Sequence, residues 1–266
     1  MKKLLSSCCD KCASVISESV CFLREKKIKK GKYVPKHVAI IMDGNRRWEK
    51  KRNAWFRSSS KSGHQSGAEA VLNIIPVAKK IGIRILTLFT FSTENWQRSP
   101  EEVTLIFSLL TDYLKRQVSY MVGEGIRLRC LGDYSELPRN LQEAIEMAVH
   151  STRNMTDMDL NLAINYGSKN ELVRAFGKMH SDIIKKKLNE STIDENLVNS
   201  YLDTQGMEEP ELLIRTSGEL RISNFLLWQI AYTELYFTKT LWPDFAPKDL
   251  LKAIASFQAR IRRRGK

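Results

Sequence analysis

The stretch His37-Val38-Ala39-Ile40-Ile41-Met42-Asp43-Gly44-Asn45-Arg46-Arg47-Trp48 decides the fold class. Its first six residues form a short apolar run soon after Pro35, and such a run predicts a buried strand. The run stops at Asp43, where a polar and basic segment begins. In open parallel sheets, ligands bind beyond the carboxyl ends of the strands, so this segment is the first candidate for a functional site.

Outward from this stretch, strand-like and helix-like patterns alternate along the chain. Apolar runs predict further strands at residues 84–91, 126–131, 160–164 and 211–214. Apolar residues at helical spacing predict helices at residues 66–80, 101–118, 136–150, 169–187 and 247–262. The alternation predicts one α/β domain with a central, mostly parallel sheet flanked by helices. This domain would span residues 35–262, between a basic, Cys-containing tail at 1–34 and a basic end at 263–266.

The predicted helix 101–118 has a clear start and a wide apolar face. Ser99 offers a capping hydroxyl and Pro100 suits the first turn. The apolar face carries Val103, Ile106, Leu110 and Leu114. Such a stripe is either part of the core or one wall of a pocket for a long apolar ligand.

The chain of 266 residues has a net charge of +13, and this surplus lies at its two ends. Residues 1–36 carry +7 and residues 246–266 carry +6, whereas residues 37–245 are neutral. Blocks of like charge at termini are usually solvated arms, with an anionic membrane surface or a nucleic acid as alternatives. Because the basic residues are terminal, we expect no nucleic-acid partner. A module that stacks bases on Trp48, Trp55 and Phe56 is the alternative.

The sequence predicts neither a membrane span nor export. No stretch approaches the roughly 18 apolar residues of a transmembrane helix, and Asp10 and Lys11 interrupt any signal-peptide core. Cys9 and Cys12 form a lone CxxC pair in a tail that also holds Cys8 and Cys21. A zinc site there is a weak alternative to reduced thiols, so we expect a cytoplasmic protein.

Polar residues follow several of the predicted strands. They occupy residues 43–48, 92–96, 165–167 and 215–219. Asp43 with two arginines suits an anion held by guanidinium groups and by a metal that bridges to the carboxylate. Arg215 and Arg221 lie near Gly-containing turns and suit a diphosphate, or they pair with a surface acid such as Glu219.

Two further residues are candidates only in combination with these segments. His64 precedes a predicted helix and is either a packed polar residue or a catalyst. Glu234 lies among aromatic residues, where a divalent cation is one partner for a buried acid. The chain has no P-loop, no dinucleotide fingerprint, no GxSxG elbow and no Asp-Asp pair. The residues alone therefore predict an α/β enzyme that acts on a phosphorylated ligand with a divalent metal.

The order of these motifs resembles the cis-prenyltransferase family, of the bacterial undecaprenyl diphosphate synthase (isoprenyl transferase) type. The matching stretches are residues 37–48, Gly63-His64, residues 91–98, 127–133, 165–167, 214–219, 221–229 and 234–243. Together they extend over residues 35–262 in the family's order. The resemblance implies an α/β fold with an apolar tunnel.

The resemblance also implies an activity. Isopentenyl diphosphate units would be condensed onto an allylic diphosphate, farnesyl diphosphate, to give a long-chain polyprenyl diphosphate such as undecaprenyl diphosphate, the lipid-carrier precursor for cell-wall glycan synthesis. It further implies Mg2+ as cofactor, a homodimer, and a cytoplasmic enzyme with peripheral contact at the inner membrane face. The helix 101–118 would line the tunnel.

Site residues are carried over by position. Asp43 would be the catalytic carboxylate and a metal ligand, Asn95 would take part in removing the isopentenyl proton, and Glu234 would complete the metal site. The residues implied to bind substrate are Gly44, Asn45, Arg46, Arg47, Trp48, His64, Ser92, Thr93, Glu94, Trp96, Arg98, Arg215, Arg221, Ile222 and Ser223.

Some positions depart from the family pattern. Arg46 and Ser217 stand where glycine is common, and either Arg57 or Lys61 fills the basic position before Gly63-His64. A non-catalytic, membrane-associated subunit is a further alternative. The joint presence of Asp43, Asn95, Arg221 and Glu234 argues against it.

Overall fold

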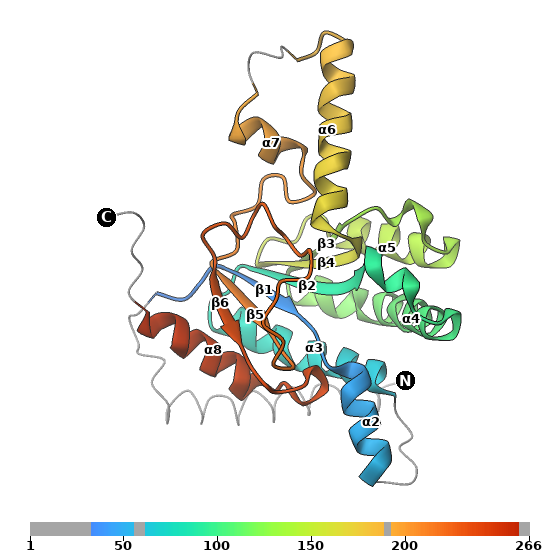
Figure 1. Cartoon of the computed structure of the whole chain (residues 1–266), viewed down its shortest axis with the longest axis vertical. Coiled ribbons are helices and arrows are strands. Elements are labelled where there is room, and N and C mark those ends of the chain that lie inside the picture. Colours follow the sequence, from blue (N-terminus) through green and yellow to red (C-terminus); the bar gives the residue numbers. More distant parts are fainter. Residues whose placement is uncertain (1–32, 56–61, 189–192, 261–266) are drawn as a thin grey trace. The chain divides into compact units, whose positions relative to one another are not determined.

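The computed structural model describes residues 33–55, 62–188 and 193–260 of the chain. Its strands are β1 (His37–Ile41), β2 (Ile85–Ser92), β3 (Ile126–Leu131), β4 (Met158–Tyr166), β5 (Leu212–Arg215) and β6 (Glu234–Phe237). Its α-helices are α2 (Asn45–Trp55), α3 (Gly63–Lys80), α4 (Pro100–Gly123), α5 (Arg139–Thr152), α6 (Ser168–Ile184), α7 (Glu195–Tyr201) and α8 (Pro247–Ala259) (Figure 1).

The strands form one sheet in the order β3-β4-β2-β1-β5-β6. The pairings β1–β5, β5–β6 and β3–β4 are parallel. The predicted α/β fold with a mostly parallel sheet is therefore confirmed. Contacts within this fold group into two compact units, and each is described by itself.

Unit 1 contains β1, β5 and β6 with helices α2, α3 and α8, and its described residues lie within Met1–Leu86, Glu211–Leu220 and Glu234–Lys266. In its sheet, Ile41 pairs with Arg215, so the loops after β1 and β5 begin at the same level. This register places residues 43–48 beside residues 215–219. The first and last of the predicted polar strand ends therefore adjoin.

Unit 2 consists of Thr87–Pro210 and Arg221–Thr233. It contains most of β2, together with β3, β4 and helices α4 to α7. Its segment Arg221–Thr233 forms neither a helix nor a strand. This unit brings together the predicted polar ends at residues 92–96 and 165–167.

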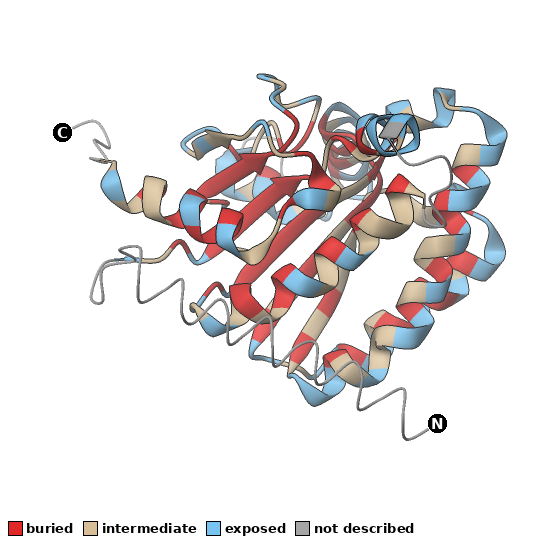
Figure 2. Cartoon of the chain, turned by 90° about the horizontal axis from the view of Figure 1, so that it is seen from below, coloured by how far each residue is buried: buried red, intermediate tan, exposed pale blue. Residues whose placement is uncertain are grey.

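The central strands form the core because they are apolar on both faces. Every residue of β1 is buried, and Leu212, Leu213 and Ile214 of β5 have no exposed surface. Figure 2 shows the strands largely in the colour of buried residues. Continuous burial is expected where helices cover both faces of a parallel sheet, and it explains the uninterrupted apolar runs in the sequence.

Most predicted elements are confirmed, with shifted ends. The strand Ile126–Leu131 matches its predicted bounds, and Ser99 caps α4 by accepting a hydrogen bond from the Glu102 N–H. Helix α5 begins at Arg139 rather than at 136. The reason is Pro138, because a residue that precedes proline is disfavoured in helical conformation. Helix α8 ends at Ala259, and Arg260 already has extended backbone.

Two α-helices, α2 and α7, and one strand, β6, were not predicted. Helix α2 begins at Asn45, directly after Gly44, within a sequence that is typical of a turn. Its residues are mostly basic and polar, so it lacks the apolar periodicity by which helices are recognised. β6 has only four residues, begins with an acid and has no buried residue, so it lacks the buried apolar run that marks β5.

Several predictions concern residues outside the described part of the chain. These are the tail cysteines Cys8, Cys9, Cys12 and Cys21, the residues Phe56, Arg57 and Lys61, and the basic end at 263–266. The side chain of Trp55 is also outside it. In the described part, none of the helices combines the length and the apolar character needed to cross a membrane.

Candidate active site

Asp43 follows β1 directly, and its backbone is fixed from two directions. Its N–H donates to Thr216 Oγ1 at 2.9 Å, and its carbonyl accepts from the Trp242 N–H at 3.1 Å. The Thr216 hydroxyl also lies 2.6 Å from the Asp43 carbonyl oxygen. These contacts hold the carboxylate at the carboxyl end of β1, the edge at which parallel sheets bind ligands.

Two arginines meet this carboxylate. Arg215 Nη2 donates to Asp43 Oδ2 at 2.8 Å, and Arg47 Nη2 lies 3.4 Å from Oδ1. The Arg215 side chain is 4% exposed, whereas that of Asp43 is 29% exposed. Arg47 comes from the first turn of α2 and Arg215 from the last residue of β5. The structure therefore assembles Asp43, Arg47 and Arg215 as one charged cluster.

Acidic and hydroxyl groups complete this cluster. Arg47 Nη1 lies 3.0 Å from Glu219 Oε1 and donates to the Ser217 carbonyl at 3.1 Å. Its Nη2 donates to Ser217 Oγ at 2.5 Å. Arg215 pairs with the acid Asp43, and Glu219 pairs with Arg47.

The environment keeps Asp43 ionised. Partial burial raises the pKa of its carboxyl, but hydrogen bonds from Arg215 and Ser217 and the charges of Arg215 and Arg47 outweigh this effect. The resulting pKa lies below its ordinary value, so the group is a carboxylate at neutral pH. The ionised, partly exposed carboxylate can bind a cation, and the guanidinium groups beside it can bind a diphosphate.

Gly44 and Asn45, where the chain passes from β1 into α2, lie close to neighbouring segments of the chain. Gly44 has φ +118°, and a Cβ there would lie 3.0 Å from the Leu241 side chain. Across from Asn45, a Cβ on Gly63 would lie only 2.2 Å from the Asn45 carbonyl oxygen. Glycine at residue 63 therefore lets the N-termini of α2 and α3 approach each other, and His64 lies in the first turn of α3 at this place.

Trp48 and Arg46 differ in their surroundings. Trp48 is buried, and its indole N–H donates to Asp244 Oδ1 at 2.7 Å. Arg52 lies over its ring, 4.9 Å from the centroid. Trp48 is therefore part of the packing between α2 and the Trp242–Asp244 turn, whereas Arg46 is exposed. The structure gives Trp48 a packing role that the sequence did not indicate.

Glu234 is not brought to Asp43. It lies at the start of β6 in register with Leu212, which pairs with Val38, so Asp43 is five residues further along the strand direction. At about 3.3 Å per residue, this register separates the two residues by about 16–17 Å along the strand direction. Glu234 Oε2 instead accepts from Arg260 Nη1 at 2.5 Å. The joint metal site predicted for Asp43 and Glu234 is therefore not formed within one copy of the chain.

In unit 2, residues 92–98 form a tight turn with internal hydrogen bonds. The turn is the 3-10 helix η1 (Thr93–Gln97). Asn95 Oδ1 accepts from the Ser92 N–H at 3.2 Å, and Thr93 Oγ1 donates to Glu94 Oε2 at 3.2 Å. The oxygen of Asn95 thus serves the turn itself.

Trp96 and Arg98 are held by neighbours in the same unit. The Trp96 indole N–H donates to Asn165 Oδ1 at 2.8 Å, and its ring packs on Phe91 and Phe107 with centroids 5.5 and 5.3 Å away. Arg98 pairs with Glu102 at 2.9 Å. Phe91 and Phe107 are buried, whereas Trp96 is 41% exposed, so the aromatic cluster reaches the surface only at Trp96.

The predicted residues Arg221, Ile222 and Ser223 lie in unit 2, at the start of an irregular segment. Arg221 and Ser223 are exposed and Ile222 is half-buried. Apart from Glu234, the predicted site residues thus fall into two groups, one in each unit. The first is gathered around Asp43, and the second is carried by residues 92–98 and 221–223.

Sequence reasoning missed the residues that hold these groups in place. Thr216 and Ser217 hold Asp43 and Arg47, and Asn224 joins Glu94 by a hydrogen bond of 2.9 Å. Thr216 and Ser217 belong to a polar strand end, and Asn224 to a matching stretch, so a signal was present. The sequence signal did not distinguish residues that position other side chains from residues that contact a ligand.

The donor set fits a divalent cation held jointly with a substrate. Mg2+ is usually bound by one or two carboxylates, water and substrate phosphates. Asp43 supplies such a carboxylate. In the described residues there is no group of three or more His, Cys, Asp or Glu that could hold a metal ion by itself.

Comparison with known proteins gives a consistent result. A family model described as "Putative undecaprenyl diphosphate synthase" matches residues 41–265. The chain is 54% identical to an isoprenyl transferase of Chlamydia muridarum over 245 residues, 92% of this chain and 94% of that protein. It is 44% identical to an isoprenyl transferase of Clostridium tetani over 232 residues, 87% of this chain and 89% of that protein.

Solved structures agree with these sequence matches. Lavandulyl diphosphate synthase from Lavandula x intermedia, in complex with dimethylallyl diphosphate, has a TM-score of 0.83 and 38% identity, covering 88% of this chain and 99% of that one. A probable undecaprenyl diphosphate synthase from Campylobacter jejuni has a TM-score of 0.72 and 32% identity, covering 88% of this chain and 100% of that one. The chain therefore belongs to the prenyltransferase family of undecaprenyl diphosphate synthases and is an enzyme that transfers prenyl groups.

Proposed function

We propose that the enzyme extends farnesyl diphosphate by successive additions of isopentenyl diphosphate, each forming a cis double bond, to a long-chain polyprenyl diphosphate such as undecaprenyl diphosphate. The observation that carries the proposal is the ionised Asp43 carboxylate held by Arg215 at 2.8 Å and flanked by Arg47 at 3.4 Å. Such a cluster suits a reaction in which diphosphate leaves with several negative charges. The isoprenyl transferases to which the chain is similar support the same reaction.

In this proposal the cluster in unit 1 binds diphosphate. Arg47 and Arg215 donate to phosphate oxygens, since guanidinium groups suit planar, bidentate contacts. The backbone N–H groups of Gly44, Asn45 and Arg46, before and within the first turn of α2, add donors at a helix N-terminus. His64 at the start of α3 takes a phosphate contact or a proton.

A Mg2+ ion bound by Asp43 would neutralise charge on the departing diphosphate. Within one copy of the chain, Glu234 lies too far along the strands from Asp43 to bind the same ion. It would reach that ion only from a second copy of the chain. Its pairing with Arg260 joins the start of β6 to the residue that follows α8. We therefore propose Asp43 as the main metal ligand of each copy.

The second substrate is assigned to unit 2. Arg221, Ile222 and Ser223 bind the diphosphate of isopentenyl diphosphate, and Ser92, Thr93, Glu94 and Arg98 border it. The bond from the allylic carbon to the diphosphate oxygen breaks, a carbon–carbon bond forms, and a proton leaves the isopentenyl unit. Because an amide is a poor base, Asn95 orients this unit, and the proton passes to a more basic group such as a diphosphate oxygen.

The hydrocarbon chain is assigned to apolar surface next to this turn. Phe91, Trp96 and Phe107 form a cluster in which the ring centroids lie 4.9 to 5.5 Å apart. Val103, Ile106 and Leu114 of α4 are buried, as expected of core residues, and Leu110 is half-buried. We propose that the aromatic cluster and α4 form one wall of a tunnel, in which each buried CH2 contributes about 0.8 kcal/mol.

The enzyme is further proposed to be a homodimer. Helix α6 exposes Val173, Phe176 and Ile184 by 68%, 53% and 67%, and these residues share one helical stripe. An unpartnered apolar stripe supports contact with a second copy. Light scattering after size-exclusion chromatography should give a dimer for the wild type and a monomer for Phe176→Asp. A monomeric wild type would contradict the proposal.

Contact with the cytoplasmic face of the membrane is proposed for the two basic ends, which carry the chain's +7 and +6. A long polyprenyl product favours release into lipid, and anionic headgroups attract polybasic segments. In a sedimentation assay, a larger fraction of the protein should pellet with vesicles that contain phosphatidylglycerol than with neutral vesicles.

One assay tests the reaction itself. The purified chain is incubated with farnesyl diphosphate, radiolabelled isopentenyl diphosphate and Mg2+, and the extracted products are separated by length. We expect labelled products several isoprene units longer than the primer, and none when EDTA removes the metal. Absence of any such product with Mg2+ present would overturn the proposal.

A further inference from the structure

The residues proposed to bind isopentenyl diphosphate belong to an unusual stretch of backbone in unit 2. Within the irregular segment Arg221–Thr233, Ser223, Asn224 and Leu226 have positive φ values of 48°, 61° and 49°. Left-handed backbone is unfavourable for residues other than glycine, and it persists only where neighbouring contacts impose it. The contacts that impose it here should therefore determine where Arg221 and Ser223 lie.

Asn224 makes most of these contacts. Its Nδ2 donates to Glu94 Oε1 at 2.9 Å, and its Oδ1 accepts from the Lys169 N–H at 2.9 Å. Its carbonyl accepts from the Ser168 N–H at 2.8 Å. One side chain thus joins the turn after β2 to the first turn of α6, and it uses both ends of its amide group.

The packing around Asn224 leaves little room for another arrangement. A Cβ on Gly167 would lie 2.8 Å from Asn224 Nδ2 and 2.5 Å from Thr93 Oγ1. A side chain at residue 167 would therefore push the Thr93 hydroxyl and the Asn224 amide out of their present positions. Three of the stretches that match the family, at residues 91–98, 165–167 and 221–229, converge on Asn224.

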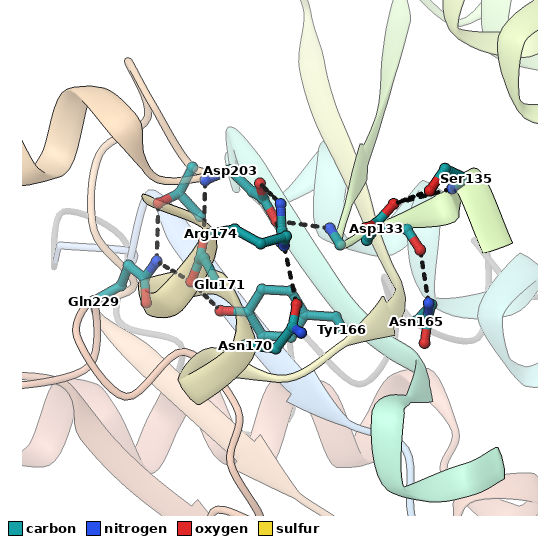
Figure 3. Close-up of polar contacts among 11 residues, drawn as sticks. Asp133, Ser135, Asn165, Tyr166, Asn170, Glu171, Arg174, Asp203 and Gln229 are labelled. Carbon is teal, nitrogen blue, oxygen red and sulfur yellow. Dashed lines mark hydrogen bonds and ion pairs between the residues drawn. The ribbon is translucent and has the colours of Figure 1, made fainter. Parts of the chain in front are cut away.

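A second anchor holds the other end of the segment. Gln229 Nε2 donates to Glu171 Oε2 at 3.1 Å and to Thr204 Oγ1 at 3.0 Å. Glu171 is itself fixed by the Tyr166 hydroxyl at 2.5 Å and by the Asp203 N–H at 2.9 Å. Figure 3 shows Gln229, Glu171 and Tyr166 in this network, which Asp203 and Arg174 extend. The segment is thus held at Asn224 and at Gln229, and Ser223 directly precedes the first anchor.

Glu94 is an ionised acceptor for Asn224. Burial raises the pKa of the Glu94 carboxyl, but the hydrogen bonds from Asn224 and from the neighbouring Ser92 and Thr93 outweigh it, so its pKa lies below the ordinary value. Hydrogen bonds to a carboxylate are stronger than those between neutral groups.

We propose that Asn224 is a positioning residue that clamps Ser223 and Arg221 to the turn carrying Glu94, and thereby sets the affinity for isopentenyl diphosphate. The inference rests on the proposed function for the identity of that substrate. Asn224 acts through its neighbours: its amide is occupied by Glu94 and Lys169, so it holds the residues that meet the diphosphate.

The test is a double-mutant cycle at residues 94 and 224. Asn224→Asp replaces the donor with a carboxylate that faces Glu94, whereas its other oxygen still accepts from Lys169. In the Glu94→Gln background, the new amide at residue 94 can donate to the new carboxylate at residue 224, which restores the hydrogen bond in reverse. We expect N224D to raise KM for isopentenyl diphosphate at least tenfold in the wild type and less than threefold in E94Q. The primer KM should stay within threefold of the wild type throughout.

A second readout does not depend on turnover. Amide hydrogen exchange over residues 223–227 should accelerate at least tenfold in N224D and return toward the E94Q rate in the double variant. Asn170→Asp is the matched control, because Asn170 is exposed on α6 and its Oδ1 accepts from Arg174. It should leave both readouts within twofold of the wild type.

The outcomes distinguish the proposed positioning role of Asn224, called the clamp here, from the proposed elongation reaction. A KM for isopentenyl diphosphate that N224D leaves unchanged, or raises equally in both backgrounds, overturns the clamp. Unchanged exchange over residues 223–227 in N224D overturns it as well, whether or not the enzyme turns over. A wild type that makes no polyprenyl product overturns the proposed function, and with it the assigned substrate, but leaves the exchange measurement decisive for the clamp.

Discussion

Arg215 Nη2 donates a hydrogen bond of 2.8 Å to Asp43 Oδ2, and so joins the ends of two neighbouring strands. The backbone register already sets Arg215 opposite Ile41, two residues before Asp43. The arginine side chain is 4% exposed and the aspartate side chain 29%. The buried partner therefore holds the partly exposed one, and the carboxylate faces solvent from a fixed position.

Arg215→Lys tests whether the guanidinium shape matters. Lysine keeps the charge but has no planar fork, so it cannot replace contacts to Asp43 and to a diphosphate at once. We expect KM to rise about tenfold for at least one of the two diphosphate substrates, the effect of losing one charge-assisted hydrogen bond. Arg139→Lys is the control, because Arg139 forms an exposed pair with Glu143 on α5. Equal KM values for the two variants would contradict the role of Arg215.

Gly63→Ala tests the close approach of α2 and α3. The new Cβ would lie 2.2 Å from the Asn45 carbonyl oxygen, so one helix must move. We expect the free energy of unfolding to fall by about 1–3 kcal/mol, as for other overpacked sites. Gly177→Ala on α6 meets nothing within 4 Å and should instead raise it by about 0.5–1 kcal/mol. Urea unfolding measures both, and equal stability of the two variants would contradict the packing described.

Glu171→Gln tests how the buried Glu171 carboxyl, which accepts a hydrogen bond from Gln229, makes stability depend on pH. Burial raises the pKa of Glu171 above its ordinary 4.5, although hydrogen bonds from Tyr166 and Gln229 act in the opposite direction. The folded state therefore holds this proton more tightly than the unfolded state. As the pH rises from about 4.5 through the folded pKa, the wild type loses the stability that protonation supplies.

The measurement is the difference in unfolding free energy between the wild type and Glu171→Gln across pH 4 to 8. We expect the wild type to lose stability relative to the variant as the pH rises. Glu143→Gln, with a side chain 59% exposed, should show no such trend. A constant difference between the wild type and Glu171→Gln would mean that Glu171 ionises in the folded chain as it does in the unfolded one.

The sequence was sufficient for most of the sheet, because its central strands are apolar on both faces. β1 and β5 are recognised as uninterrupted runs, and their parallel pairing explains why Asp43 and Arg215 adjoin. Helix α2 was not predicted, since a basic and polar sequence after Gly44 carries no apolar periodicity. Its formation depends instead on tertiary contacts such as Trp48 with Asp244.

The site was predictable as a set of residues but not as an arrangement. Asp43, Arg47 and Arg215 meet as their strand ends suggest, whereas Glu234 lies about five residues back along the sheet, in register with Leu212. Strand register is set by side-chain packing, and the pattern of a four-residue strand cannot reveal it. The role of Asn224 likewise depends on its contacts with Glu94 and Lys169, which are far away in the sequence.

The most direct test of the account compares wild type, Asp43→Asn and Asp159→Asn in the Mg2+-dependent elongation assay. The amide oxygen introduced at residue 43 can still accept from Arg215, so the fold should persist while the negative charge is lost. Asp159 pairs with Arg127 at 2.7 Å in unit 2 and serves as the matched control. We predict that Asp43→Asn lowers kcat by about 100-fold to 1,000-fold, and that Asp159→Asn stays within threefold of the wild type. An Asp43→Asn variant that elongates the primer at the wild-type rate would contradict the account.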